Sequence, residues 1–181
     1  MPSDLQRRRV RSVNQFDVAM FVLRLVFGCF LAYHGLNKVR GGLAGTATWF
    51  ASIGMKWPLW QARLAATTEI GAGLMFAAGL LTPLAAAGMV AVMLVAIRVD
   101  HWTNGFFIFN KNQGWEYCAS IAVVAFCVAT VGAGRWSVDH ALGVTWHGWA
   151  GAIIAGALGL SGAVLQLTLS YRPNRKPGAP T

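Results

Sequence analysis

The sequence contains few charged residues. Only 12% of its 181 residues are Asp, Glu, Lys or Arg, whereas 56% are hydrophobic, and the mean hydropathy is +0.52. A single soluble domain of this length does not need so much apolar surface for its core. The composition therefore excludes an ordinary soluble protein and predicts an integral membrane protein.

Cysteine and histidine are scarce, with three and four residues. The cysteines form no CxxC pair and no metal-ligand spacing, which argues against thiol–disulfide exchange; Cys118 is the only plausible participant. No histidine lies well inside an apolar window, where a membrane haem takes its ligands. His34, His101 and Glu116 are expected on one membrane face, but no local ligand motif joins them. We predict no metal and no intrinsic cofactor.

Acidic residues are fewer than basic ones, six against fifteen, which gives a net charge of +9. The basic residues are not interleaved with a nucleic-acid-binding motif, so we expect no nucleic acid as a partner. Beside membrane spans, basic clusters are orientation signals and contacts to anionic lipid head groups. The two terminal clusters comprise Arg7, Arg8, Arg9, Arg11, Arg172, Arg175 and Lys176.

Apolar windows of about 20 residues, the length that crosses a bilayer, are abundant. Because every backbone group needs a partner inside lipid, they predict an all-α, antiparallel helical bundle. An odd number of spans places the termini on opposite faces. The dense basic cluster favours the N-terminus inside, which we expect, although the loops and tail of the other side carry more basic residues in total. Segment 43–57 is either an interfacial helix or an ordinary loop. The predicted spans are 17–38, 60–80, 83–99, 116–132 and 149–171.

Two charged residues fall inside the first two predicted spans, Arg24 and Glu69. Burying such charges costs several kcal/mol unless they are paired or face a polar cavity. Helical rise places them at similar depths, so they are predicted to pair. The pair either locks two helices in register or lines a cavity that binds a small ligand or moves a proton. Lys38 shares the Arg24 face of the first span, with His34 adjacent.

Small residues form four-residue rows in the last window. Such rows allow close helix approach, either within the bundle or between two copies, and we favour packing within the bundle. The predicted packing residues are Gly151, Ala155, Gly156 and Gly159.

Several short stretches, in order on successive spans, resemble the DoxX family of small bacterial membrane proteins: Arg24 with HGLNK, then EIGAG, VAIRVDHWTNGFF, GWEY and GAGRWSVDH. The resemblance covers roughly 17–142 and implies a four-helix core in a multi-pass protein of the bacterial plasma membrane. It leaves a basic tail (1–16), an additional C-terminal span (143–171), as in an actinobacterial-type member, and a disordered basic tail (172–181). By motif, the family's polar positions correspond to Arg24, His34, Lys38, Glu69, His101, Asn104, Glu116 and Asp139.

The resemblance also implies a function. Family members include a subunit of a thiosulfate:quinone oxidoreductase and components of membrane oxidoreductase complexes. It thus implies a subunit of a redox-related, quinone-linked complex, with other redox-complex subunits or a second copy as partners. Two alternatives stay open: a non-catalytic anchor or assembly subunit, and a small proton-coupled transporter. No catalytic residue is assigned, and whether the chain is itself an enzyme is left open.

Overall fold

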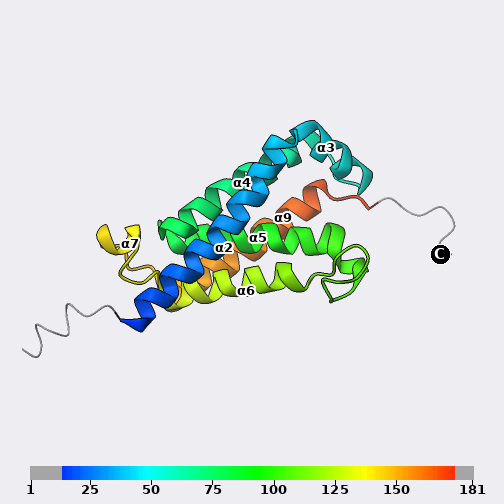
Figure 1. The fold of residues 1–181 in the computed structure, drawn as a ribbon. Helices are drawn as coiled ribbons and strands as arrows, with labels where there is room; N and C mark the ends of the chain where they lie inside the picture. Colours follow the sequence, from blue (N-terminus) through cyan, green and yellow to red (C-terminus); the bar gives the residue numbers. More distant parts are fainter. Residues whose placement is uncertain (1–13, 174–181) are drawn as a thin grey trace, which may run out of the picture.

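The computed structural model describes residues 14–173. Within this range, long helical segments lie side by side in one bundle and no strand is present (Figure 1). The all-α fold class is therefore confirmed. The predicted terminal tails lie mostly outside the described residues, at 1–13 and 174–181. The long segments are α2 (Gln15–Arg40), α4 (Pro58–Ala78), α5 (Thr82–Ala96), α6 (Glu116–Val131) and a last helix, α8–η3–α9, from Trp149 to Ser170.

Local sequence sets the ends of these helices. The side chain of Asn14 caps α2 by accepting a hydrogen bond from the backbone N–H of Phe16 at 3.3 Å. Proline occupies the first turn of α4 and of α5, where its missing N–H leaves no helical hydrogen bond unmade. Gly79 ends α4 with a positive φ of 66°, a conformation that favours glycine.

Two of the helices contain π-helical turns. The α5 helix continues through η1 (Ile97–His101), which is a π-helix, and η2 (Trp102–Asn104). The last helix consists of α8 (Trp149–Ile153), the π-helical η3 (Ile154–Leu158) and α9 (Gly159–Ser170). Single π-turns inside helices occur often at functional sites.

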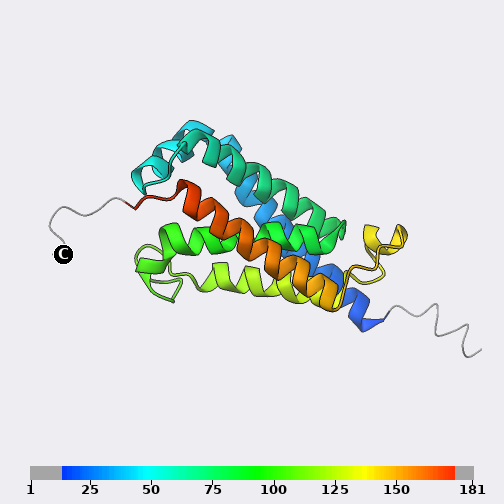
Figure 2. The same cartoon turned by 180° about the vertical axis from the view of Figure 1, so that it is seen from behind.

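The bundle has two ends, named here after the short helices that lie there (Figure 1). The α7 end carries α7 (Val138–Ala141) and the turn between α4 and α5. The α3 end carries α3 (Leu43–Ser52) and the loop 105–115. The described chain begins at the α7 end and finishes at the α3 end (Figures 1 and 2).

Length and composition identify this chain as a multi-pass membrane protein. Of the described residues, three helices are long and apolar enough to cross a bilayer: Gln15–Arg40, Thr82–Asn104 and Trp149–Ser170. The α6 helix is apolar but shorter, and α4 has 21 residues but carries several polar ones. That all five segments cross the bilayer stays a prediction. Exposed aromatic residues occur at both ends, as in the interfacial belts of membrane proteins: Trp57, Trp60, Trp102 and Phe109 at the α3 end, Trp136, Trp146 and Trp149 at the α7 end.

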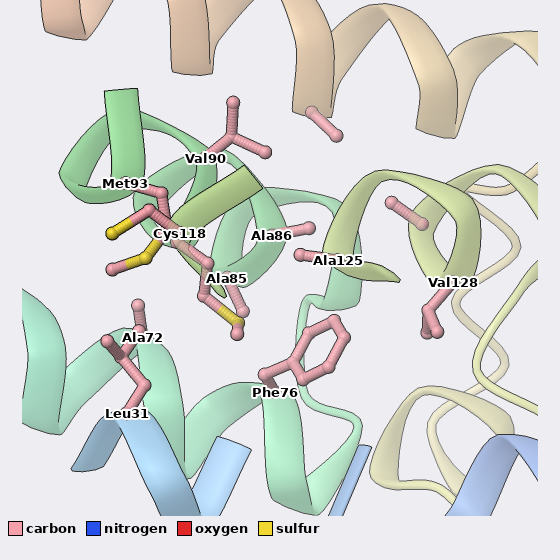
Figure 3. Close-up of a cluster of buried hydrophobic side chains, with 13 residues drawn as sticks. Leu31, Ala72, Phe76, Ala85, Ala86, Val90, Met93, Cys118, Ala125 and Val128 are labelled. Carbon is pink, nitrogen blue, oxygen red and sulfur yellow. The ribbon is translucent and has the colours of Figure 1, made fainter. Parts of the chain in front are cut away.

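The core lies where α2, α4, α5 and α6 meet (Figure 3). Leu31, Phe76 and Val128 are almost completely buried there. Small residues bring the helices together, because a Cβ atom on Gly28 would lie only 2.5 Å from the carbonyl oxygen of Gly73. The α2 helix thus packs closely along α4.

The small residues of the last helix pack within the chain. Gly151 lies against the α6 backbone at Ala129, and Gly156 lies against the ring of Phe126. Gly159 lies against Val90 of α5, and Ala155 is fully buried in the core. This helix therefore forms one wall of the bundle.

Segment 43–57 is mainly helical. The α3 helix packs its buried residues Ala47 and Phe50 against α4. The chain after it pairs with the end of α9: the N–H of Lys56 donates to the carbonyl of Ser170 at 2.7 Å, and the N–H of Arg172 donates to that of Gly54 at 2.8 Å. These contacts close the bundle at the α3 end.

Candidate functional site

The predicted pairing of Arg24 with Glu69 is wrong. Arg24 is fully buried near the α7 end, and its Nη1 donates to the carbonyl of Ala77 at 3.3 Å. Its Nη2 donates to the carbonyl of Trp136. Glu69 pairs with Lys38 instead.

The helix register explains this correction. Glu69 lies beside Gly35 of α2, and the eleven residues from Arg24 to Gly35 span roughly 16 Å of helix. The sequence-based estimate of depth placed the start of the second span level with the end of the first. The α2 helix ends at Arg40, five residues past Gly35, whereas α4 begins at Pro58, eleven residues before Glu69. The α4 helix therefore begins farther out than α2 ends, and Glu69 lies nearer the α3 end.

A structural cluster surrounds Arg24 at the α7 end. Asp139 accepts hydrogen bonds from the N–H of Leu81 at 2.6 Å, the N–H of Thr82 at 2.9 Å and the hydroxyl of Thr82 at 2.6 Å. Its carboxylate therefore caps the N-terminus of α5, where the N-cap residue Leu81 has no side chain that can accept a hydrogen bond. The same carboxylate attracts Arg24. Asp17 binds the same loop, accepting from the N–H of Arg135 at 2.8 Å. These charges fasten loop 132–148 to the bundle.

A large, open hollow also lies at the α7 end, with a volume of about 760 Å³. Its lining includes Asp17 and Asp139. Both carboxylates already bind backbone N–H groups, and the other polar side chains of the hollow include His140 and His147. Size alone does not make it the candidate site.

A cavity of about 380 Å³ lies inside the bundle toward the α3 end. Four of the sequence-predicted residues line it, as do several polar residues that the prediction missed, and the remaining walls are apolar. The predicted residues are His34, Lys38, Glu69 and His101, and the additional polar ones are Thr68, Asp100, Gln113, Tyr117 and Gln166.

One polar pair in this cavity joins α2 to α4. The Nζ of Lys38 lies 2.6 Å from Oε2 of Glu69. The Glu69 side chain is 7% exposed and that of Lys38 is 23% exposed. The carboxylate is thus held inside the protein by one ammonium group that itself reaches the cavity.

A second polar pair joins η1 to α6. The Nδ1 of His101 lies 2.9 Å from the carbonyl oxygen of Gln113, and its Nε2 lies 2.7 Å from the hydroxyl of Tyr117. A carbonyl can only accept, so we assign the proton of the neutral ring to Nδ1. Nε2 then accepts a hydrogen bond from Tyr117. The carboxylate of Asp100 lies 3.6 Å from Nε2, close enough to attract a protonated ring.

The predicted residues Asn104 and Glu116 do not line this cavity. The Asn104 amide donates to the carbonyls of Asp100 and Asn112, each at 3.0 Å. Glu116 accepts from the N–H of Ile108 at 3.2 Å. Both side chains hold the loop that brings Gln113 to His101.

The three cysteines are free thiols. Cys118 is buried and lines the cavity, whereas Cys29 and Cys127 are exposed. Across residues 14–173, no group of three His, Cys, Asp or Glu side chains is arranged to hold a metal ion.

The cavity thus combines donors, acceptors and proton-exchanging groups on apolar walls. Residues 19–102 match the DoxX family model. This match supports membership of the DoxX family. The match contains Lys38, Glu69 and His101, whereas Tyr117 and the last helix lie beyond the matched residues. DoxX proteins form a membrane family associated with redox-related functions. No curated protein and no solved structure matches the chain.

Proposed function

We propose that this DoxX chain is a membrane subunit of a redox complex in the bacterial plasma membrane and that it binds a quinone in the cavity at the α3 end. The single observation that carries the proposal is that Lys38–Glu69 and His101–Tyr117 line the same cavity. Its volume of about 380 Å³ falls within the range typical of small-molecule sites.

The chemistry of the two pairs suits a quinone. A quinone ring carries carbonyl oxygens that accept hydrogen bonds. The Lys38 ammonium has three donors, of which one binds Glu69. The hydroxyl of Tyr117 has lone pairs that accept a hydrogen bond from the reduced form, the quinol. Apolar residues such as Met93 and Val99 would contact the ring faces.

The two pairs also provide places for protons. Oxidation of a quinol to a quinone releases two electrons and two protons. A proton passed to the Tyr117 oxygen can be balanced by transfer of the Tyr117 proton to Nε2 of His101, where Asp100 stabilises the charged ring. The Glu69 carboxylate is the second acceptor. The reverse steps return both protons, and a partner subunit exchanges the two electrons.

Binding of a short-chain quinone to the purified protein in lipid nanodiscs tests this proposal. Trp49 lines the cavity, so quenching of tryptophan fluorescence should report binding, and Trp49→Phe should reduce the signal. Glu69 holds the Lys38 ammonium, which is the donor to the quinone carbonyl. Glu69→Gln should therefore weaken binding about 10-fold or more, because hydrogen bonds to charged groups contribute about 1.5–3 kcal/mol and 1.4 kcal/mol is tenfold in affinity.

Arg63→Gln is the matched control, because Arg63 is exposed on α4, the helix that carries Glu69, and does not line the cavity. It should leave the affinity within about twofold of wild type. Absence of saturable binding, or equal effects of the two substitutions, would contradict a quinone site here. Normal activity of the complex with Glu69→Gln would instead favour the anchoring role.

A further inference from the structure

A second hollow lies on the outer side of the bundle between α2 and α6 and is called here the lateral groove. Its volume is about 430 Å³. Phe27, Phe30 and Tyr33 of α2 line it, and Ser120 lies opposite on α6. Three residues line both the groove and the inner cavity: His34, Tyr117 and Ile121. The two spaces therefore adjoin.

The sequence of α2 accounts for this opening. Its glycines Gly28 and Gly35 face α4 and allow very close packing. On the groove side it carries large aromatic residues, and Phe30 and Tyr33 are 59% and 64% exposed. The α2 helix consequently packs against α4 far more extensively than against α6.

Polar contacts bridge two other sides of the inner cavity. At the α3 end, residues 54–56 are hydrogen-bonded to residues 170–172. On the α9 side, the amide of Gln166 donates to Gln61 of α4 at 2.8 Å. The lateral groove borders the cavity on the side between α2 and α6, where Phe30 and Tyr33 are exposed.

We propose that the ligand of the cavity carries a long hydrocarbon tail, that this tail lies in the lateral groove, and that the ligand enters sideways from the bilayer between α2 and α6. This inference rests on the proposed function, and it specifies a ligand that is a lipid with a polar ring as its head. The two spaces adjoin at His34 and Tyr117, and this neighbourhood argues for one molecule that occupies both.

The groove is not expected to add much affinity, because the tail moves from lipid hydrocarbon to aromatic side chains. Its role is to give a ring that carries a long tail a route into the inner cavity. Filling the groove should therefore exclude tailed ligands and spare tailless ones.

The experiment compares two quinones with the same ring, one without a tail and one with a long isoprenoid tail. Ser120→Trp fills the groove, because Ser120 lines the groove but not the inner cavity. It should lower the affinity for the tailed quinone at least tenfold and leave that for the tailless quinone within twofold. Ser161→Trp is the control: Ser161 is also an exposed helical serine bonded to its own helix, and it lines neither space.

The outcomes separate the two proposals. Equal losses for both quinones, or no loss for either, would overturn the lateral route, whereas tailless binding that depends on Glu69 would still support the quinone site. Failure of both quinones to bind the wild-type protein would refute the proposed function itself.

A second measurement does not depend on the folding of a variant. A tailed quinone with a photoreactive diazirine in its tail should label Phe27, Phe30 or Tyr33, and excess tailless quinone should suppress the labelling. Labelling that persists under this competition, or that a diazirine phospholipid reproduces equally, would show that the groove holds ordinary acyl chains and would overturn the inference.

Discussion

Lys38 and Glu69 form an ion pair of 2.6 Å that joins α2 to α4 at the wall of the inner cavity. Arg24 lies on the same helix as Lys38, fourteen residues or roughly 21 Å away, and belongs to the cluster around Asp139 at the α7 end. The chain thus separates its buried charges into two groups. One group fastens a loop to the bundle, and the other lines a cavity.

The Lys38–Glu69 pair should respond asymmetrically to substitution. Lys38→Met leaves a carboxylate that is 7% exposed without its partner, and breaking a buried pair in this way typically costs about 3–5 kcal/mol. Glu69→Leu should cost less, because Lys38 is 23% exposed and its long side chain can reach polar surroundings. Unfolding in mixed detergent micelles measures both. The double variant should recover most of the loss, and additive losses would show that the pair does not interact.

Arg24 should be energetically independent of Glu69. Arg24→Met removes the hydrogen bonds to the carbonyls of Ala77 and Trp136 and should lower the free energy of unfolding by several kcal/mol. Combining it with Glu69→Leu should give a sum of the single effects within about 0.5 kcal/mol, as expected for distant sites. Rescue of Arg24→Met by Glu69→Leu would contradict the observed register.

Asp139 should matter for stability and not for ligand binding. Asp139→Ala leaves three donors of Leu81 and Thr82 without their acceptor, and loss of a helix cap costs about 0.5–2 kcal/mol. Asp139→Asn keeps an acceptor and should cost less. Thermal unfolding should show this order, while quinone affinity of the folded fraction should match wild type. A selective loss of affinity in Asp139→Asn would place the ligand at the α7 end instead.

The two ends of the described chain should label from opposite sides of the membrane. Asn14 lines the hollow at the α7 end, and Arg172 is hydrogen-bonded to Gly54 at the α3 end; each is replaced by Cys. In a background lacking Cys29, Cys118 and Cys127, an impermeant maleimide should modify only the Arg172→Cys protein in intact cells, since we expect the N-terminus inside. Modification of both proteins from outside would show that the chain crosses the membrane an even number of times and would contradict five spans.

The sequence was sufficient to predict the long helices, because residues near each end in the chain determine where these helices begin and end. Pro58 and Pro83 lie in first turns, and the predicted span 116–132 differs by one residue from α6. The π-turn at 97–101 was not predicted. It depends on packing between distant segments, which hydrophobic periodicity does not record.

The candidate site was only partly predictable. Glu69 was singled out as a charge inside a predicted span, Lys38 because it shares the Arg24 face, and His101 because it follows the third span. Tyr117 was missed, although a tyrosine in the first turn of an apolar helix at the same end was an available signal. Arg24 was misassigned because the carbonyl of Trp136 that it binds is 112 residues away in the chain.

The most direct test of the cavity as a quinone site is photolabelling with a quinone that carries an azide on its ring, followed by peptide mapping. The label should appear on residues lining the inner cavity, such as Trp49, Phe50 or Tyr117, and Glu69→Gln should reduce it while Arg63→Gln does not. Labelling concentrated at the α7 end, on residues such as His140 or His147, or labelling indifferent to Glu69, would contradict the account.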